Sequence, residues 1–409
     1  MRLAVVSPFI DRRHGTERAF AELIERLSRD YGCEVHIYAQ RVEDLTLSDP
    51  RAPRTTDSGT IIWHRVPSVP GPHLAQFVSW MISNGFLRSW HALFRRTSYD
   101  LVLSPGINCL HPDVVIVHAL FHRLRELARA EKGERAADAG FFRRAHRRVY
   151  YALLSGLERR IYGDARVTLA AASKRTAGLL RDYIRRDDVR VVPNGVDLAY
   201  FSPKARTTRR AEARNRRGFR DEDLVLLLIG NDWRTKGLPA TLAALAALPR
   251  ESRPQLLVVG NDSPEHFQAS ASRLGLQDCC RWETPRSDVL DFYAAADIYV
   301  SPTREDCFSL PVLEAMACGL PVITSVFNGV VDCIHDGVDG FVMREPRDAQ
   351  KLAQIIRRLQ ADAGLKQNVG AAAAEAARGW SWSRNAEAAW ELLKVASAKK
   401  KQTRYRKPF

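Results

Sequence analysis

The segment from Ile298 to Ser325 constrains the fold of this chain more than any other stretch of the sequence. It opens on a short apolar run, which predicts a buried strand, and continues through a polar loop into residues with helical spacing. The apolar positions of that helix are Leu310, Leu313 and Ala317. Ser309 is placed to cap the helix, and Gly319 followed by Pro321 ends it. A second buried run, 322–324, then predicts the next strand, so the segment is a βαβ unit.

Two carboxylates of this unit are predicted to lie near one another. Side chains of a helix lean toward its N-terminus, so Glu314 points back at the loop that holds Asp306. Unpaired backbone N–H groups at the start of the helix are suited to binding an anion. The residues that carry these groups are Cys307, Phe308, Ser309 and Leu310. Carboxylates beside an anion site fit a ligand that is both hydroxyl-rich and phosphorylated, such as a nucleotide sugar.

Composition limits the class of protein. The 409 residues suffice for two domains of ordinary size, with 45% hydrophobic and 27% charged residues. No apolar run approaches the roughly 20 residues that span a bilayer, and the start of the chain is typical of a strand rather than a signal peptide. The seven cysteines include no CxxC pair, which favours a reduced, cytoplasmic protein. A net charge of +15 indicates an anionic partner: a membrane surface, nucleic acid or a phosphorylated substrate.

The N-terminal half begins like a Rossmann-like domain. A strand at 2–7, a loop at 8–15, a helix at 17–28 and a strand at 34–38 follow in order. In such a domain the ligand binds at the carboxyl ends of the strands. Residues 99–106 and 112–118 predict two further strands.

A histidine stands at the carboxyl end of the last of these strands. His118 therefore faces the predicted crevice, and His122 is the second candidate. A purely structural histidine is the alternative for both positions.

Residues 123–166 predict a long, strongly basic helical region in which arginines alternate with aromatic residues. Its arginines include Arg143, Arg144, Arg147 and Arg148, beside Phe141, Phe142 and Tyr150. Such a pattern is typical of membrane-surface or nucleic-acid binding, whereas a solvated helix face explains any single arginine. Trp80, Phe86, Trp90, Phe94, Arg95 and Arg96 add to the same pattern. Because no nucleic-acid motif accompanies it, we favour an anionic membrane surface.

The C-terminal half predicts a second sheet. Strands are expected at 224–229 and 256–260, after an arginine-rich surface helix within 204–220. Asp221 and Asp223 form a DxD, but its place just before a strand indicates a polar turn, and no metal is assigned to it.

The string DCFSLPVLEAMACGLPVI, from Asp306 to Ile323, resembles the acidic-x7-Glu signature of retaining glycosyltransferases of family 4. The family usually has Glu first and then Gly-Phe-Gly, whereas this chain has Asp306, Cys307, Phe308 and Ser309. Glu305 leaves a register shifted by one residue as an alternative. The resemblance implies the GT-B fold, in which two Rossmann-like, doubly wound domains face each other across a crevice.

Other strings carry the same resemblance. Residues 191–201 are similar to the family's V-x-P-N-G-V-D-x-x-x-F connection. The string GNDWRTKG, 230–237, places Lys236 where the family has its diphosphate-binding lysine, while Asn231 replaces the family's arginine. The string is similar to that of the lipopolysaccharide core glucosyltransferase branch, which also lacks this arginine and has a basic residue nearer the lysine. In this chain Arg234 would compensate for the missing arginine. Of the two glycines usual in the first loop, Gly15 is present and His14 takes the other place.

The resemblance also predicts the domain limits and a base-binding loop. The base would be read near Arg286, in the loop 284–289. The domains are expected at 1–188 and 204–378, joined by the connection 189–203. The last segments are a helix within 379–397 that crosses back to the N-terminal domain and a basic, disordered tail at 398–409.

These observations predict a retaining transferase that moves a hexose from a nucleotide sugar to a hydroxyl of a lipid-linked or cell-envelope glycan. A UDP-sugar is favoured, and GDP-mannose is the second choice. Lys236 and Arg234 would neutralise the departing diphosphate, aided by backbone amides near Gly15 and Phe308. Asp306 and His118 would hold the donor sugar. No metal or other cofactor is expected.

Glu314 would bind the ribose of the donor. The enzyme is expected in the cytoplasm, peripheral on the inner face of the membrane. Two other classes stay open: a GT-B protein that binds nucleotide sugar without transferring it, and a basic nucleic-acid-binding protein.

Overall fold

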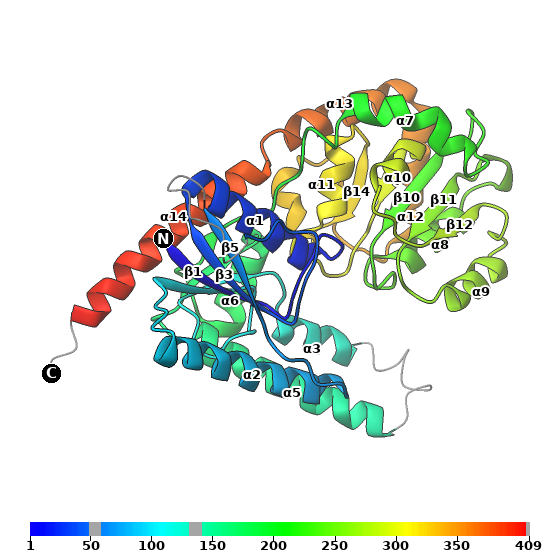
Figure 1. The fold of residues 1–409 in the computed structure, drawn as a ribbon. Coiled ribbons are helices and arrows are strands. Elements are labelled where there is room, and N and C mark those ends of the chain that lie inside the picture. The colour runs from blue at the N-terminus through cyan, green and yellow to red at the C-terminus, as the bar shows by residue number, and fades with distance from the viewer. Residues whose placement is uncertain (49–58, 131–140, 406–409) are drawn as a thin grey trace. The chain divides into compact units, whose positions relative to one another are not determined.

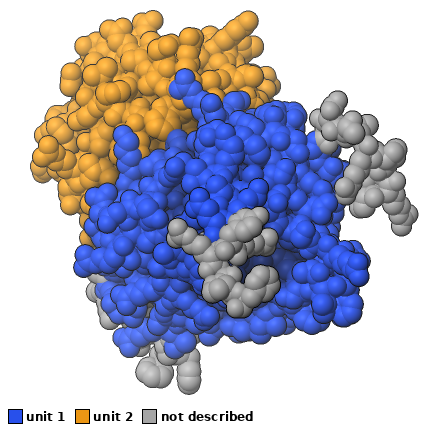
Figure 2. All heavy atoms as spheres, turned by 90° about the vertical axis from the view of Figure 1, so that its left-hand side faces the viewer, with its two compact units in different colours: residues 1–193, 383–409 blue, residues 194–382 orange. Residues whose placement is uncertain are grey.

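The computed structural model describes residues 1–48, 59–130 and 141–405; the side chains at positions 130, 141–147 and 403–405 lie outside this description. The chain divides into two compact units (Figure 2). Unit 1 comprises residues 1–193 and 383–409, and unit 2 comprises residues 194–382. Among the described residues, every helix is too short or too polar to cross a bilayer.

Unit 1 is built on a parallel sheet in the order β5-β3-β1-β6-β7-β8-β9. Its strands are β1 Arg2–Val6, β3 Glu34–Ala39, β5 Thr60–Arg65, β6 Leu101–Ser104, β7 Val114–Val117, β8 Thr168–Ala171 and β9 Arg190–Val191. A small parallel pair, β2 Phe9–Ile10 with β4 Arg41–Val42, lies apart from this sheet. The inner strands are short and almost fully buried, which is typical of parallel sheets covered on both faces, whereas the edge strands β5 and β9 are more exposed.

Helices cover both faces of the unit 1 sheet (Figure 1). They are α1 Gly15–Tyr31, α2 His73–Phe94, α3 Phe121–Ala130, α5 Phe141–Tyr162, α6 Lys174–Ile184 and α14 Trp382–Tyr405. Alternate residues of β1 show the two faces: Leu3 and Val5 pack in one core with α1 and α14, whereas Ala4 and Val6 pack in another with α2. This alternation is what a strand period of two requires.

The last helix corrects one prediction. Residues 398–409 were expected to be a disordered tail, but α14 continues to Tyr405. The extension is anchored by Lys400, whose Nζ lies 2.7 Å from a carboxylate oxygen of Asp113 and 2.9 Å from the carbonyl oxygen of Asp100. The basic residues of this segment therefore include one that stabilises unit 1.

Unit 2 contains a parallel sheet in the order β12-β11-β10-β13-β14-β15. Its strands are β10 Val225–Ile229, β11 Gln255–Val259, β12 Cys280–Glu283, β13 Ile298–Val300, β14 Val322–Ser325 and β15 Phe341–Met343. Its helices are α7 Pro203–Asn215, α8 Leu238–Ala246, α9 Glu265–Arg273, α10 Leu290–Ala295, α11 Leu310–Ala317, α12 Ala349–Ala361 and α13 Ala363–Ala377, with short 3-10 turns at Arg250–Ser252 and Gly329–Cys333. The prediction of two doubly wound α/β domains is confirmed.

Helix α7 lies at the surface as predicted, but not all of its arginines are solvated. The guanidinium of Arg214 is buried and donates to the carbonyl oxygens of Ala295 and Asp223 at 3.0 and 2.7 Å. Arg214 also pairs with Asp297. Ala295 and Asp297 lie 81 and 83 positions from Arg214 in the chain, and Asp223 lies beyond the end of α7, so the pattern of α7 alone could not reveal these acceptors. Part of the excess positive charge is thus used inside unit 2.

In both parallel sheets the order in which successive strands are added reverses at one place. Numbered within each sheet, the strands run 3-2-1-4-5-6-7 in unit 1 and 3-2-1-4-5-6 in unit 2, so in both the first and fourth strands are neighbours whose connections leave toward opposite sides. In unit 2 this pair is β10 and β13. Ligands of doubly wound sheets bind at the carboxyl ends of such strands. The loops after β10 and β13 are therefore the first place to look for a site in unit 2.

Candidate functional site

The loops after β10 and β13 are tied together through their backbones. The amide of Arg304 donates to the carbonyl oxygen of Thr235 at 2.8 Å, and the Thr303 hydroxyl donates to the same oxygen at 2.9 Å. Gly237 has a φ of +90°, and a Cβ there would lie 2.3 Å from the carbonyl oxygen of Pro302. Only glycine fits this close approach, so the two loops are held in one relative position.

This arrangement brings Lys236 and Asp306 into an ion pair between Nζ and Oδ2. Both side chains are largely buried, with 20% and 13% of their surfaces exposed. The backbone of Asp306 is fixed as well, because its amide donates to Phe327 at 3.0 Å and its carbonyl oxygen accepts from Gly329 at 2.8 Å. The sequence predicted both residues for the donor site, and the structure places them in direct contact.

The sequence predicted unpaired backbone amides at the start of α11, and for two of them this prediction is wrong. The Phe308 amide donates to Asp306 Oδ1, and the Ser309 amide donates to Asn328 Oδ1, each at 3.2 Å. Leu310 is the first residue of α11, where amides have no partner within the helix. Cys307 is half-buried in the same loop. An anion here would take the place of Asp306 as the acceptor of the Phe308 amide.

Ser309 occupies the position before α11, but its hydroxyl does not cap the helix as predicted. Pro311, the second helical residue, lacks one of the N–H groups from which a capping side chain can accept. Asn328 instead holds the Ser309 amide. The sequence analysis missed Asn328; its position in an Asn-Gly pair just after β14 was the available signal.

Glu314 is buried on α11 and has a partner from α10. The hydroxyl of Tyr293 donates to Glu314 Oε2 at 2.6 Å. Burial, reinforced by the Glu314 carboxylate, raises the pKa of Tyr293 well above its usual range. Tyr293 therefore stays a hydrogen-bond donor that fixes this carboxylate, a role that sequence reasoning did not assign.

The first part of the 230–237 loop is held by the loop after β11. Asp262 accepts the amides of Asp232 and Trp233 at 2.8 and 2.7 Å. Asn231 accepts the amide of Asn261 at 3.0 Å, so the residue that replaces the family's arginine connects two loops. Arg234 lies beside His266 of α9, 3.3 Å from its Nε2.

Two further expectations concern loops of unit 2. Arg286 is exposed and pairs with Glu283 at 3.1 Å, at the end of β12. The DxD residue Asp223 accepts the amide of Arg220 at 2.8 Å and pairs with its guanidinium. This bonding fits the polar turn that the sequence predicted.

In unit 1, His118 follows β7 directly. Its Nδ1 lies 3.1 Å from the carbonyl oxygen of Ile116, and its ring meets Phe20 edge-on at 5.6 Å. A carbonyl can only accept, so Nδ1 carries the proton and Nε2 has the lone pair when the ring is neutral.

His122, the second candidate, is buried against Glu158 of α5. Its Nδ1 lies 2.6 Å from Glu158 Oε2, and the same carboxylate accepts the amides of Phe121 and His122 at the start of α3. Burial raises the pKa of Glu158 to about 7. This pair fixes the start of α3, which the sequence did not indicate.

The loop before α1 is organised by a buried carboxylate. Asp11 accepts the amides of Arg13 and His14 at 2.8 and 3.0 Å, and His14 Nδ1 lies 3.0 Å from it. Burial by itself would raise the pKa of Asp11, but these hydrogen bonds outweigh it and the pKa is lowered. Gly15, the first residue of α1, has open space where a Cβ would lie.

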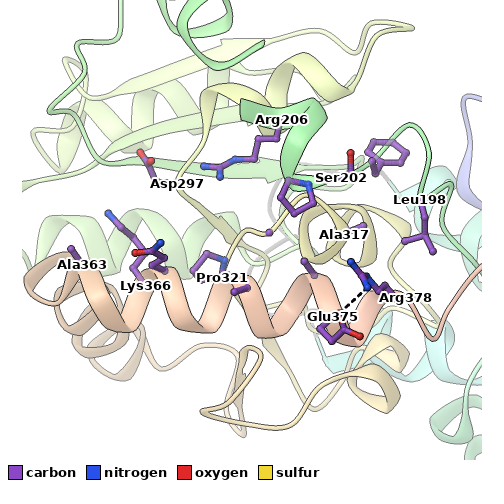
Figure 3. Close-up of a pocket in the computed structure, with 16 residues that line it drawn as sticks. Leu198, Ser202, Arg206, Asp297, Ala317, Pro321, Ala363, Lys366, Glu375 and Arg378 are labelled. Atoms are coloured by element: carbon purple, nitrogen blue, oxygen red, sulfur yellow. Dashed lines mark ion pairs between the residues drawn. The ribbon is translucent and has the colours of Figure 1, made fainter. Parts of the chain in front are cut away.

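A groove of about 810 Å³ lies elsewhere in unit 2, between α7, α11 and α13 (Figure 3). None of the predicted site residues lines it. Arg206, one of the cations that line it, is half-buried and donates to the carbonyl oxygens of Tyr293 and Ala296, and burial lowers its pKa to about 10. Because neither Lys236 nor Asp306 lines the groove, it is separate from the candidate donor site.

Two family models match most of the chain. One described as Glycosyltransferase Family 4 matches residues 13–200, and one described as Glycosyl transferases group 1 matches residues 209–376. A D-inositol 3-phosphate glycosyltransferase of Salinispora arenicola is 33% identical over 262 residues, 58% of this chain and 58% of that protein. The lipopolysaccharide glucosyltransferase WaaG of Escherichia coli is 33% identical over 155 residues, 37% of this chain and 41% of that protein. The chain thus matches less than two thirds of these relatives' lengths.

Solved structures match over nearly the whole chain. The structure of WaaG, a glycosyltransferase involved in lipopolysaccharide biosynthesis, has a TM-score of 0.75 at 21% identity and covers 97% of this chain and 98% of its own. Anabaena HepE in complex with UDP-glucose has a TM-score of 0.69 at 16% identity, with 97% and 100% covered. At such identities the likeness establishes a shared fold.

Proposed function

This chain belongs to glycosyltransferase family 4 and has the GT-B fold, and from that premise we propose that it is a retaining hexosyltransferase. The donor is a nucleotide sugar, and the acceptor is a hydroxyl of a lipid-linked or cell-envelope glycan. A UDP-sugar is the favoured donor and GDP-mannose the second. The HepE structures of the same fold, which hold UDP or UDP-glucose, support testing UDP-sugars first.

The observation that carries this proposal is the Lys236–Asp306 pair at the carboxyl ends of β10 and β13, where the strand order of unit 2 reverses. Without donor, each residue neutralises the other. A diphosphate carries more negative charge than one carboxylate and would draw Lys236 Nζ to itself. Asp306 would then be released to accept hydroxyl groups of the sugar. The same lysine would stabilise the charge that grows on the leaving diphosphate during transfer.

Glu314 supplies the second carboxylate of the proposed donor site. With Oε2 already held by Tyr293, it is positioned before the donor arrives. Preorganised acceptors of this kind bind a ribose without the entropic cost of ordering a side chain. Arg286 and the amides of Cys307 and Leu310 keep their predicted roles toward the nucleotide. The Phe308 amide would join them once Asp306 turns to the sugar, whereas the Ser309 amide stays with Asn328.

His118, Gly15 and Arg234 also keep the roles that the family resemblance gives them. With Nδ1 bound to a backbone carbonyl, the Nε2 lone pair of His118 suits acceptance of a sugar hydroxyl. No side chain is assigned as a covalent nucleophile. In this proposal the departing phosphate assists proton removal on the same face of the sugar, and the charge is balanced by side chains and amides rather than by a metal ion.

Thermal shifts with UDP-, GDP- and ADP-sugars test the donor, and turnover of a labelled form of the binding sugar tests the reaction. We expect one nucleotide class to raise the melting temperature and to be consumed when an envelope lipid fraction is added. Binding without consumption would instead favour a protein that holds nucleotide sugar and does not transfer it. No shift with any sugar would contradict the proposal.

A further inference from the structure

Helix α2 of unit 1 is apolar on almost every side, although only one side is covered. Its inner face packs on the sheet through Trp80 and Met81, and the indole nitrogen of Trp80 donates to the carbonyl oxygen of Asn108 at 2.9 Å. Trp80, which the sequence grouped with the membrane-facing residues, is thus a core residue. In Figure 1, α2 lies along the outside of unit 1.

The opposite face of α2 carries large apolar side chains that stay exposed in the described structure. They are Val78, Ile82, Phe86, Trp90, Leu93 and Phe94, with exposed fractions from 41% to 72%. Their spacing of mostly three or four residues places them on one side of the helix. Three of them form a continuous aromatic row, because Trp90 contacts Phe86 and Phe94 with ring centroids 6.2 and 4.0 Å apart.

A helix that is apolar all round is normally buried, and soluble proteins seldom leave such a long apolar face in water. The charges around this face indicate what covers it. The sequence of α2 contains no acidic residue, and its one charged residue is Arg88. Two exposed arginines, Arg95 and Arg96, follow immediately. Exposed aromatics with arginines and without carboxylates match the interface of an anionic bilayer.

We propose that the outer face of α2 docks on an anionic lipid bilayer, with its rings at the level of the headgroups and Arg95 and Arg96 against the phosphates. The docking serves the proposed transfer to a lipid-linked acceptor, but it requires no turnover. It places membrane contact on α2 rather than on the predicted arginines of α5. Of those, Arg143, Arg144 and Arg147 lie outside the described side chains, and Arg148 is exposed.

Flotation with vesicles of phosphatidylcholine, alone or with about 30 mol% phosphatidylglycerol, tests this surface. The variant Phe86→Ser/Leu93→Ser removes one exposed ring and one exposed aliphatic side chain and leaves the core face of α2 intact. Its matched control is Val149→Ser/Leu153→Ser, which changes two exposed residues of α5. We expect the first variant to bind anionic vesicles roughly tenfold or more weakly than wild type, and the control to bind like wild type. Brominated lipid should quench wild-type tryptophan emission more than that of Trp90→Phe.

Equal flotation of wild type and Phe86→Ser/Leu93→Ser would overturn the proposal. So would a dimer in sedimentation velocity without lipid that the same variant dissociates, because α2 would then bind a second copy of the chain. Circular dichroism and the thermal shift with nucleotide sugar show whether each variant is folded. Donor consumption measured in parallel separates the two proposals: a wild-type protein that consumes donor but does not float with anionic vesicles refutes only the membrane surface.

Discussion

Replacing Lys236 by methionine removes the charge of the proposed catalytic cation and keeps most of the side chain that passes over Gly230. One cation about 4 Å from a phosphate gains roughly 4 kcal/mol of gross attraction at an effective dielectric near 20. The pair with Asp306, which the donor must displace, offsets part of that gain in the ground state. Lys236 attracts the departing diphosphate more strongly than the diphosphate of the intact bound donor. The substitution should therefore lower kcat by about 10²-fold and change KM much less.

The same substitution has a second, independent consequence. It leaves the Asp306 carboxylate, only 13% exposed, without its cation, so the free energy of unfolding should fall by about 1–2 kcal/mol. The double variant Lys236→Met/Asp306→Asn removes both charges and should recover most of that stability but none of the activity. Steady-state kinetics and urea unfolding on the two single variants and the double variant measure both effects.

Lys204→Met is the control, because Lys204 is an exposed residue of α7 outside the site. Its kinetic constants and unfolding midpoint should match those of wild type. A Lys236→Met enzyme that changed only in KM would show that the lysine serves donor binding alone. A double variant as unstable as Lys236→Met would show that the ion pair is not what stabilises these loops.

Three other outcomes follow from the structure. Arg214→Met leaves the buried carbonyl oxygens of Ala295 and Asp223 without their guanidinium donor and removes one of the cations of Asp297, so the free energy of unfolding should drop by about 3 kcal/mol in urea titrations; an unchanged midpoint would contradict the role of α7. Burial raises the pKa of Glu158 to about 7 from near 4.5, so the folded state holds its proton and the contribution of Glu158 to stability falls as pH rises. Wild type should therefore lose about 3 kcal/mol more than Glu158→Gln between about pH 5 and pH 8, while His122, whose pKa burial lowers, acts in the opposite direction in both proteins; equal slopes would refute this. Activity should survive extensive EDTA treatment, because in this proposal Lys236 and backbone amides, and not a metal ion, neutralise the charge of the diphosphate. Activity that EDTA abolishes and a metal restores would contradict this.

The strands that the sequence predicted best are the buried ones. Runs such as 225–229 and 256–259 are apolar throughout, because both faces of a parallel sheet are covered. The edge strand β12, Cys280–Glu283, carries charged residues at half of its positions and gave no such signal. Strand β5, Thr60–Arg65, lies at the edge of the other sheet and was also missed. Edge strands bury less surface, so their sequences are less constrained.

The site could be predicted only in part, for a related reason. Lys236 and Asp306 each belong to a motif that can be read locally, and the strand order then brings their loops together. Their supporting residues are different: Asn328, Tyr293 and Asp262 act on groups that lie 19 to 30 positions away in the chain. Such contacts depend on the packed structure and leave no periodic pattern in the sequence.

The stereochemistry of transfer tests the central claim most directly. The enzyme would be given an α-linked UDP-hexose labelled with ¹³C at the anomeric carbon, together with the envelope lipid fraction, and the first product would be followed by NMR. The account predicts an α-linked product that forms with wild type and is lost with Lys236→Met. A β-linked first product, or a donor that binds and is never consumed, would contradict it.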